Sequence, residues 1–412
     1  MSAADQFVHR TVSQHARTLW HQPNGDGGAE SPPIEVHATV VASNDPVEDR
    51  YAVAALGNAL VVGVHDGHAG WQCADLMARV FHNYVGRHFI SASASGKGGE
   101  QALEAAYDEF DADLLALASQ VHALAGVSDT QRQALLMPAM AGAVSVSAIV
   151  DGDRVYVGHA GDCRAVIGRR SSTTGTGAGW TTVELTRDHD ANNPAEVKRL
   201  RSEHPGEEVV VRGRVLGGLM PFRSLGDARY KWSHAVQEWI GQVFEESEYP
   251  YKHPPRNFKS PPYVTGHPET VSYALDDKDA FMVLATDGLW EKMSSESVVD
   301  MVAEYITSQE KGTWAHVERN AAAHVVRNAF GGRDAELVAS TLKIPSPLSR
   351  RYRDDITVVV VFFRPGRSGG PEMAPVDAER PEPIDLGQSK IVATDQGLRT
   401  DGTTNVGGKA KL

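Results

Sequence analysis

The sequence predicts a single α/β (α+β) domain in which two antiparallel β-sheets form a central sandwich flanked by α-helices. Short runs rich in Val, Ile and Phe recur along the chain, and turn dipeptides such as Asp151-Gly152 separate neighbouring runs, which is typical of antiparallel strands. Longer stretches with apolar residues at three- and four-residue spacing interrupt these runs and indicate helices. Because the strands are grouped into hairpins with helices between the groups, the pattern does not favour a parallel βαβ array.

The elements follow in chain order. The strand-like runs cover 37–42, 53–64, 143–150, 154–159, 164–168, 280–285 and 356–363. Helical spacing of apolar residues predicts one helix over 73–84 and another over 103–117. Asn193-Pro194 predicts the start of a third helix, because asparagine caps a helix and proline fits its first turn. A fourth helix is expected to follow Ser294-Ser295 and to reach Ile306.

The two ends of the chain differ from its middle. Residues 1–35 show no sustained periodicity and are expected to form a mobile arm. Residues 366–412 are rich in Gly, Pro, Thr, Asp and Lys, and a segment with so few large apolar residues is expected to be a disordered tail. The folded domain is therefore predicted over 36–365, with its functional site at one end of the sandwich.

Composition excludes several classes of function. The 412 residues carry a formal net charge of −13 without a basic run, which argues against nucleic acid as a partner, because backbone phosphates require clustered Lys and Arg. An acidic balance suits divalent cations instead. No segment approaches the roughly 18–20 apolar residues of a membrane span. The two cysteines, Cys73 and Cys163, exclude a disulfide scaffold and indicate a reducing compartment.

Acidic residues stand at the ends of apolar strands. Asp66 and Asp287 each follow such a run, Asp162 follows the run that ends near Gly161, and Asp354 with Asp355 directly precedes another. Any one Asp-Gly pair alone is explained by a turn. Several carboxylates gathered in one domain repel each other unless a cation neutralises them. Oxygen ligands favour Mg²⁺ or Mn²⁺ over Zn²⁺, so a hard-cation site and a set of simple turns both remain open at this point.

Five segments resemble the metal-dependent serine/threonine phosphatase family, often called type 2C or PPM-type. They occur in the family's order between residues 48 and 357. The run from Leu216 to Asp227, followed by Tyr230-Lys231-Trp232, resembles more closely the pyruvate dehydrogenase phosphatase branch of that family. The five segments are Glu48-Asp49-Arg50, Gly63-Val64-His65-Asp66-Gly67-His68-Ala69-Gly70, Gly161-Asp162-Cys163-Arg164-Ala165, Ala285-Thr286-Asp287-Gly288-Leu289-Trp290 and Asp354-Asp355-Ile356-Thr357.

The resemblance implies a site with two Mg²⁺ or Mn²⁺ ions. Asp66 would bridge the two ions, and the carbonyl of Gly67 would bind one of them. Asp287 and Asp354 would complete the coordination of the other ion. Two ions about 3.5–4 Å apart lower the pKa of a bridging water, which then attacks phosphoserine or phosphothreonine directly, without a covalent phosphoenzyme.

Further roles carried over from the family are those of neighbouring residues. Glu48 would act through metal-bound water, and Asp162 would help to hold a weaker third ion. His68 would donate a proton to the leaving serine oxygen. Many family members carry a phosphate-binding arginine four residues before the position of Glu48. Here that position is Asn44, which is therefore a candidate phosphate contact together with Arg223. Arg223 and Asp227 could equally be a structural pair in a loop beside the site.

Three alternative functions remain to be weighed: a cysteine-based phosphatase, a non-catalytic binding protein and a type 2C phosphatase with another substrate. Cys163 and Arg169 have the C-x5-R spacing of cysteine-based phosphatases, but the residues between them are predicted to form a strand, whose amides cannot cradle phosphate. A non-catalytic relative that binds partners would be expected to lack the metal aspartates. The resemblance implies a phosphoprotein substrate, namely the pyruvate dehydrogenase complex, and hence the mitochondrial matrix. A type 2C phosphatase acting on another phosphoprotein, with a cytoplasmic location, is the runner-up.

Overall fold

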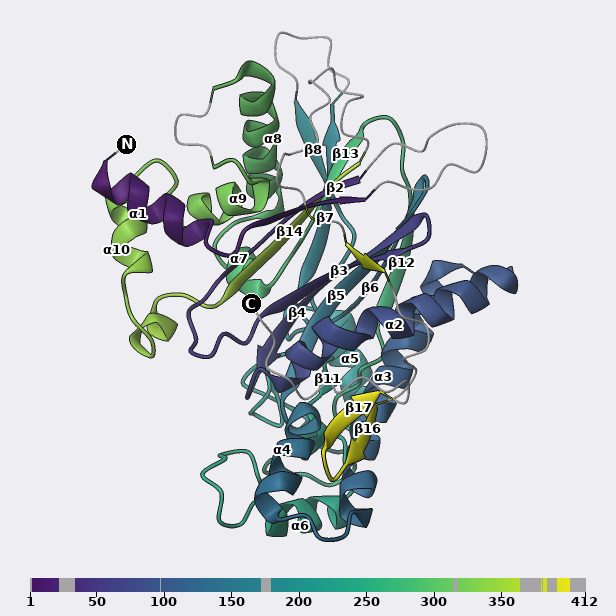
Figure 1. Ribbon diagram of the computed structural model, residues 1–412. Helices are drawn as coiled ribbons and strands as arrows, with labels where there is room; N and C mark the ends of the chain where they lie inside the picture. The colour runs from purple at the N-terminus through teal and green to yellow at the C-terminus, as the bar shows by residue number, and fades with distance from the viewer. Residues whose placement is uncertain are drawn as a thin grey trace.

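Two β-sheets stack face to face, and helices cover both outer faces (Figure 1). The computed structural model describes residues 2–21, 34–96, 98–171, 179–313, 318–363, 379, 381–383 and 391–400. The predicted fold class, a sandwich of antiparallel sheets with flanking helices, is confirmed. In these described ranges, no helix is both long enough and apolar enough to cross a membrane.

The first sheet joins segments that are far apart in the chain. Its order is β1-β2-β14-β13-β7-β8, and every neighbouring pair is antiparallel. All of β14 is buried, because it lies between β2 and β13 and is covered on both faces. The bounds are β1 Arg17–His21, β2 Ile34–Val41, β7 Arg164–Arg170, β8 Trp180–Glu184, β13 Asp279–Ala285 and β14 Ile356–Phe362.

The second sheet has the order β12-β6-β5-β4-β3-β15, and β11 pairs with β5. In this sheet β15 pairs with β3 in parallel, and all other neighbouring strands pair antiparallel. The prediction of one run over 53–64 was wrong, because a turn at Gly57-Asn58 divides it into a hairpin, with Gly57 at φ +58°. The bounds are β3 Arg50–Leu56, β4 Ala59–His68, β5 Gly142–Asp151, β6 Arg154–Ala160, β11 Leu225–Gly226, β12 Glu269–Ala274 and β15 Glu382–Pro383.

The interior between the sheets consists of alternate apolar side chains from both. Because successive side chains of a strand point to opposite faces, every second residue enters this layer and the others face the helices. Residues of this central core include Val62, Val64, Val146, Ala148, Ile167, Met282, Leu284, Val359 and Val361.

Long helices cover the second sheet, and a separate group covers the first. Helices α2 (Gln72–Ala94) and α3 (Gly99–Ala123) pack on the second sheet, where they contribute Met77, Phe81 and Phe110 to a core cluster. Helices α8 (Ser295–Lys311) and α9 (Ala321–Ala329) pack on the first sheet. Ser294 caps α8, as predicted, by accepting a hydrogen bond from the Ser297 N–H at 3.2 Å.

Other elements surround the sandwich. Asn193 caps α5, as predicted, by accepting the Ala195 N–H at 3.1 Å. The remaining bounds are α4 Asp129–Met140, α5 Pro194–Glu203, α6 His234–Val243, α7 Asp287–Trp290, α10 Ala335–Leu342, the 3₁₀ turns η1 Ala228–Tyr230 and η2 Leu348–Arg351, and the short strands β9 Val210–Val211 and β10 Arg214–Val215.

Both chain ends contain ordered segments where the sequence analysis expects an arm and a tail. Helix α1 (Ala3–Val12) buries Val8 and Val12 completely in the core cluster beside α9 and α10. In the expected tail, β16 (Ile391–Thr394) and β17 (Gly397–Thr400) form a hairpin whose Ile391 is buried against α3. Residues 1, 22–33, 366–378, 380, 384–390 and 401–412 of the expected arm and tail lie outside the described residues.

Candidate active site

The predicted acidic residues lie at one end of the sandwich, where ends of strands from both sheets meet. Asp66 is in the last part of β4, in register with Val144 of β5. Asp287 directly follows β13, and Asp162 lies in the turn from β6 to β7. Asp66 and Asp287 share a hydrogen bond, and the charge of Asp162 acts on Asp66. The structure therefore brings these three carboxyl groups together.

A fourth carboxyl group, that of Asp49, completes this acid cluster of Asp49, Asp66, Asp162 and Asp287. The predicted site includes the neighbouring Glu48 and not Asp49, yet Asp49 is only 1% exposed and its charge acts on Asp66. Its Oδ2 accepts a hydrogen bond from the Thr286 hydroxyl at 2.8 Å, while its Oδ1 is buried with no hydrogen-bond partner. The adjacent acidic pair Glu48-Asp49 before β3 is the sequence signal that could have identified Asp49. Neighbouring side chains of an extended chain point in opposite directions, so one of the two is expected to face the interior.

The electrostatics of the acid cluster suit divalent cations. Burial, and next the charges of its acidic neighbours, raise the pKa of Asp66 well above its usual value. Burial and then the charge of Asp287 raise the pKa of Asp162 to about 8. Among the described residues, no Lys or Arg forms an ion pair with any of the four carboxylates. A buried, oxygen-only donor set without a positive partner fits hard divalent cations, which remove this repulsion when they bind.

Asp354 is in an ion pair with Arg350 of η2. The positive charge of Arg350 also lowers the pKa of both Glu48 and Asp287, although burial outweighs it and leaves both pKa values raised. Arg350 is therefore paired with Asp354 alone and acts on Glu48 and Asp287 only through the field of its charge. Gly67 packs so closely beneath this region that an added Cβ would lie 2.7 Å from the Glu48 carbonyl oxygen.

Asp355 is a second residue that sequence analysis did not select. It is 1% exposed, and its carboxylate accepts hydrogen bonds from the backbone N–H groups of Ser43, Asn44 and Glu48 at 2.5 to 2.8 Å. The Asn44 side chain donates to it as well, at 2.9 Å. Asp355 thus anchors the loop that carries Glu48 and Asp49 to the start of β14.

His68 pairs with a carboxylate that lies far away in the sequence. Its Nε2 is 2.6 Å from Oδ2 of Asp227, which also accepts a hydrogen bond from the Ser224 hydroxyl. Burial lowers the pKa of His68, but the charge and hydrogen bond of Asp227 outweigh it and raise that pKa. Gly142 makes this approach possible, because a Cβ there would lie 2.1 Å from Nε2 and 2.4 Å from Oδ2.

The two candidate phosphate contacts are bound to other groups. The Asn44 amide nitrogen donates to Asp355, so it holds the loop. The guanidinium of Arg223 forms a pair with Glu196 at 2.6 Å and donates to the His267 carbonyl. Arg223 therefore forms a structural pair, which was one of the two alternatives open from the sequence. Its partner is Glu196 and not Asp227.

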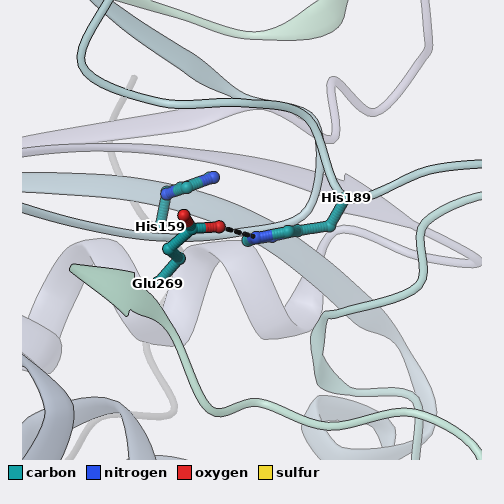
Figure 2. A group of neighbouring side chains, drawn as sticks. All are labelled: His159, His189 and Glu269. Carbon is teal, nitrogen blue, oxygen red and sulfur yellow. Dashed lines mark hydrogen bonds and ion pairs between the residues drawn. The ribbon is translucent and has the colours of Figure 1, made fainter. Parts of the chain in front are cut away.

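Three further side chains, those of His159, His189 and Glu269, gather close to one another (Figure 2). Ligand atoms of His159, His189 and Glu269 all lie within 4.8 Å of one another, which is close enough to hold a metal ion. However, the Gly161 N–H donates to Nδ1 of His189, so a neutral His189 carries its proton on Nε2, which faces Glu269 at 3.1 Å. The two imidazole rings are stacked at 10°, so their nitrogen lone pairs do not converge. The arrangement favours a hydrogen-bonded brace for the turn that carries Asp162.

The structure disfavours a cysteine nucleophile. Cys163 is fully buried, and burial followed by the charges of Asp66 and Asp162 raises the pKa of its thiol well above the usual value. The residues after it form β7, and Arg169 is paired with Asp276 at 2.7 Å, not with a phosphate cradle. This site therefore cannot supply the thiolate that cysteine-based phosphatases need.

Comparison with known proteins places this chain among phosphatases. Residues 49–331 match the family model described as protein phosphatase 2C. A protein phosphatase 2C homolog from Schizosaccharomyces pombe is 35% identical over 361 residues, covering 78% of this chain and 79% of the relative. A human protein named [pyruvate dehydrogenase [acetyl-transferring]]-phosphatase 2, mitochondrial, is 31% identical over 420 residues, covering 80% of this chain and 78% of the relative.

Solved structures support the same fold. The crystal structure of a serine-threonine phosphatase 2C from Toxoplasma gondii covers 84% of this chain and 99% of its own, with a TM-score of 0.52 and 18% sequence identity. At that identity the likeness concerns the arrangement of sheets and helices alone.

Proposed function

We propose that this chain, which belongs to the protein phosphatase 2C family and is a metal-dependent protein serine/threonine phosphatase, dephosphorylates the α subunit of pyruvate dehydrogenase. The phosphatase activity is supported by the acid cluster at the end of the sandwich and by the pair of His68 and Asp227. Buried carboxylates without positive partners need cations, and a histidine next to them can handle a proton.

The metal-binding roles are assigned as follows. Asp66, the Gly67 carbonyl, Asp287 and Asp354 would hold two Mg²⁺ or Mn²⁺ ions. Glu48 would contribute through water, and Asp162 would hold a third, weaker ion. To this set we add Asp49, because its Oδ1 is buried within the acid cluster and has no hydrogen-bond partner. When bound, such cations polarise the phosphoryl group and lower the pKa of water, which supplies the nucleophile at neutral pH.

The protein's own groups would orient the reaction. Asp227 accepts a hydrogen bond from Nε2 of His68, and its charge raises the pKa of the imidazole, which favours the protonated form of His68. A protonated His68 would give its proton to the serine oxygen as that oxygen leaves phosphorus. Asp355 would keep the Glu48–Asp49 loop in position through its four hydrogen bonds.

The substrate assignment rests on the relatives. The human relative named above is a pyruvate dehydrogenase phosphatase, described as mitochondrial, and matches four fifths of this chain. We therefore also propose the mitochondrial matrix as the location and the pyruvate dehydrogenase complex as the partner. The match to the Schizosaccharomyces pombe protein phosphatase 2C homolog keeps a second candidate, a phosphatase of the same type acting on another phosphoprotein.

The test offers phosphorylated pyruvate dehydrogenase and an unrelated phosphoserine protein side by side, with Mg²⁺, with Mn²⁺ and with a chelator. We expect phosphate release that requires the cation and is about tenfold faster on pyruvate dehydrogenase. Equal rates would favour the second candidate, and no cation-dependent release from either protein would refute the phosphatase assignment. The Asp287→Asn variant is the control. If it retained more than about 5% of activity, Asp287 would not be a metal ligand.

A further inference from the structure

A cavity of about 640 Å³ is lined by residues of the loop before β3, the loop that also carries Glu48 and Asp49. Its walls come from the loop after β2, the start of α2 and the connection between α10 and β14; they include Ser43, Asn44, Trp71, Ile344 and Arg353. This volume is in the range of ligand pockets, roughly 300–1,000 Å³. The cavity is lined by residues that none of the catalytic roles above uses for chemistry.

Arg353 is the unusual group in this cavity. It is 9% exposed, yet among the described residues no carboxylate lies within ion-pair distance of its guanidinium. Its Nη1 donates to the Ala42 carbonyl, while its Nε is buried without a hydrogen-bond partner. Burial lowers the pKa of Arg353, although the charge of Asp355 acts in the opposite direction. A guanidinium has five N–H donors and keeps its charge, so most of its binding capacity here is unused.

The other charges of the cavity do not neutralise Arg353. Arg50 is paired with Asp75 at 3.0 Å and donates to the carbonyls of Val47 and Asp49. Asp45 is exposed at the rim, where water screens it. Asp355 attracts Arg353 through space, but in the described part of the chain no carboxylate forms an ion pair with its guanidinium. Arg353 therefore presents a charged group without a direct partner in a mostly apolar wall, and a ligand of opposite charge would complete it.

The position of the cavity indicates where that ligand comes from. Ser43 and Asn44 line the cavity, and the backbone N–H groups of the same two residues donate to Asp355, which follows Asp354. One loop thus separates the cavity from the acid cluster. One loop has a thickness of about 5–10 Å, and an extended peptide covers that distance with two or three residues. A substrate residue in the cavity would therefore be two or three positions from the phosphoserine at the acid cluster.

We propose that this cavity is a specificity pocket in which Arg353 binds the carboxylate of an acidic residue two or three positions from the phosphoserine of the substrate polypeptide. This rests on the proposed phosphatase function and adds to it a preference among phosphorylated sequences. The apolar wall with Trp71 would hold the methylene groups of a glutamate or aspartate, and the unused N–H groups of Arg353 would bind its carboxylate.

The experiment measures kcat/KM with Mn²⁺ for phosphoserine peptides that carry one glutamate at each position from four before to four after the phosphoserine, against the all-alanine parent peptide. The readout is the ratio of the glutamate peptide to its parent, because a general loss of activity cancels in that ratio. For the wild-type protein we expect a ratio of about 10 at one position two or three residues from the phosphoserine.

Two variants and a control test the assignment to Arg353. In Arg353→Met and in Ile344→Glu, which places a carboxylate in the cavity, the ratio should fall to about 1. In Arg351→Ala, a change at an exposed arginine in η2, the ratio should stay near 10. If Arg353→Met does not fold, the Ile344→Glu variant still decides the question.

The failures can be told apart. Hydrolysis of every peptide at equal rates by the wild type would overturn the specificity pocket and leave the phosphatase function standing. A glutamate preference that persists in both cavity variants would also overturn it. No hydrolysis of any peptide would overturn both the proposed function and the pocket that rests on it.

Discussion

Replacement of Asp355, directly before β14, by alanine should destabilise the domain more than any single change in the loop before β3 that this carboxylate anchors. Its carboxylate accepts four hydrogen bonds. Ser43 is 2% exposed, so its N–H would remain buried without a partner, at a cost of about 1–3 kcal/mol. The donors of Asn44 and Glu48 are partly exposed, and water can replace their bonds at about 0.5–1.5 kcal/mol each. With one bond from Ser43, two from Asn44 and one from Glu48, we therefore expect the free energy of unfolding to fall by about 2.5–7.5 kcal/mol.

Urea denaturation of three variants tests this estimate. Asp355→Asn keeps the volume and one acceptor oxygen, so its loss should be about 1–3 kcal/mol, and Asn44→Ala removes one bond and should cost about 1 kcal/mol. The expected order of loss is Asp355→Ala, then Asp355→Asn, then Asn44→Ala. A loss below about 1 kcal/mol for Asp355→Ala, or equal losses for the alanine variants at both positions, would refute the reasoning that this carboxylate anchors the loop.

Three further predictions concern the active site and its surroundings. Gly142→Ala should lower kcat for a phosphopeptide about 100-fold, because the new Cβ would separate His68 from Asp227, whereas an unchanged kcat would show that this contact is not needed. A chelator should abolish activity and Mn²⁺ restore it, while a thiol alkylator leaves activity unchanged because Cys163 is fully buried; inactivation by the alkylator alone would contradict this. The pKa of Glu196 is lowered to about 2 because its hydrogen bonds and ion pairs outweigh burial, so its stabilisation is present above pH 4.5 and disappears as pH falls toward 2. The difference in melting temperature between wild type and Glu196→Gln should therefore shrink over that range, and a difference that grows toward pH 2 would show that the sign is wrong.

Local signals in the sequence predicted most of the central elements. Apolar runs predicted both halves of the sandwich, and the polar residues Asn193 and Ser294 predicted the starts of two helices, because strand and helix patterns extend over only a few neighbouring residues. The hairpin at 53–64 was missed as such, since Gly57-Asn58 interrupts an otherwise continuous apolar run. The helix α1 was missed because its ten residues are too few for a sustained pattern, and its stability comes from burial against α9 and α10.

The active site also combines features that the sequence predicts with features that only the tertiary structure sets. The order of the acidic segments along the chain, and with it the phosphatase family, could be read without coordinates, since each segment is contiguous. The partner of His68 could not be predicted from the sequence. Asp227 is 159 residues away along the chain and meets His68 only through the pairing of β4, β5 and β11. The burial of Asp49 and the place of Arg353 in the cavity wall likewise depend on how loops close over the ends of two stacked sheets. Contacts of this kind are set by tertiary packing, which brings together residues whose local sequence carries no information about one another.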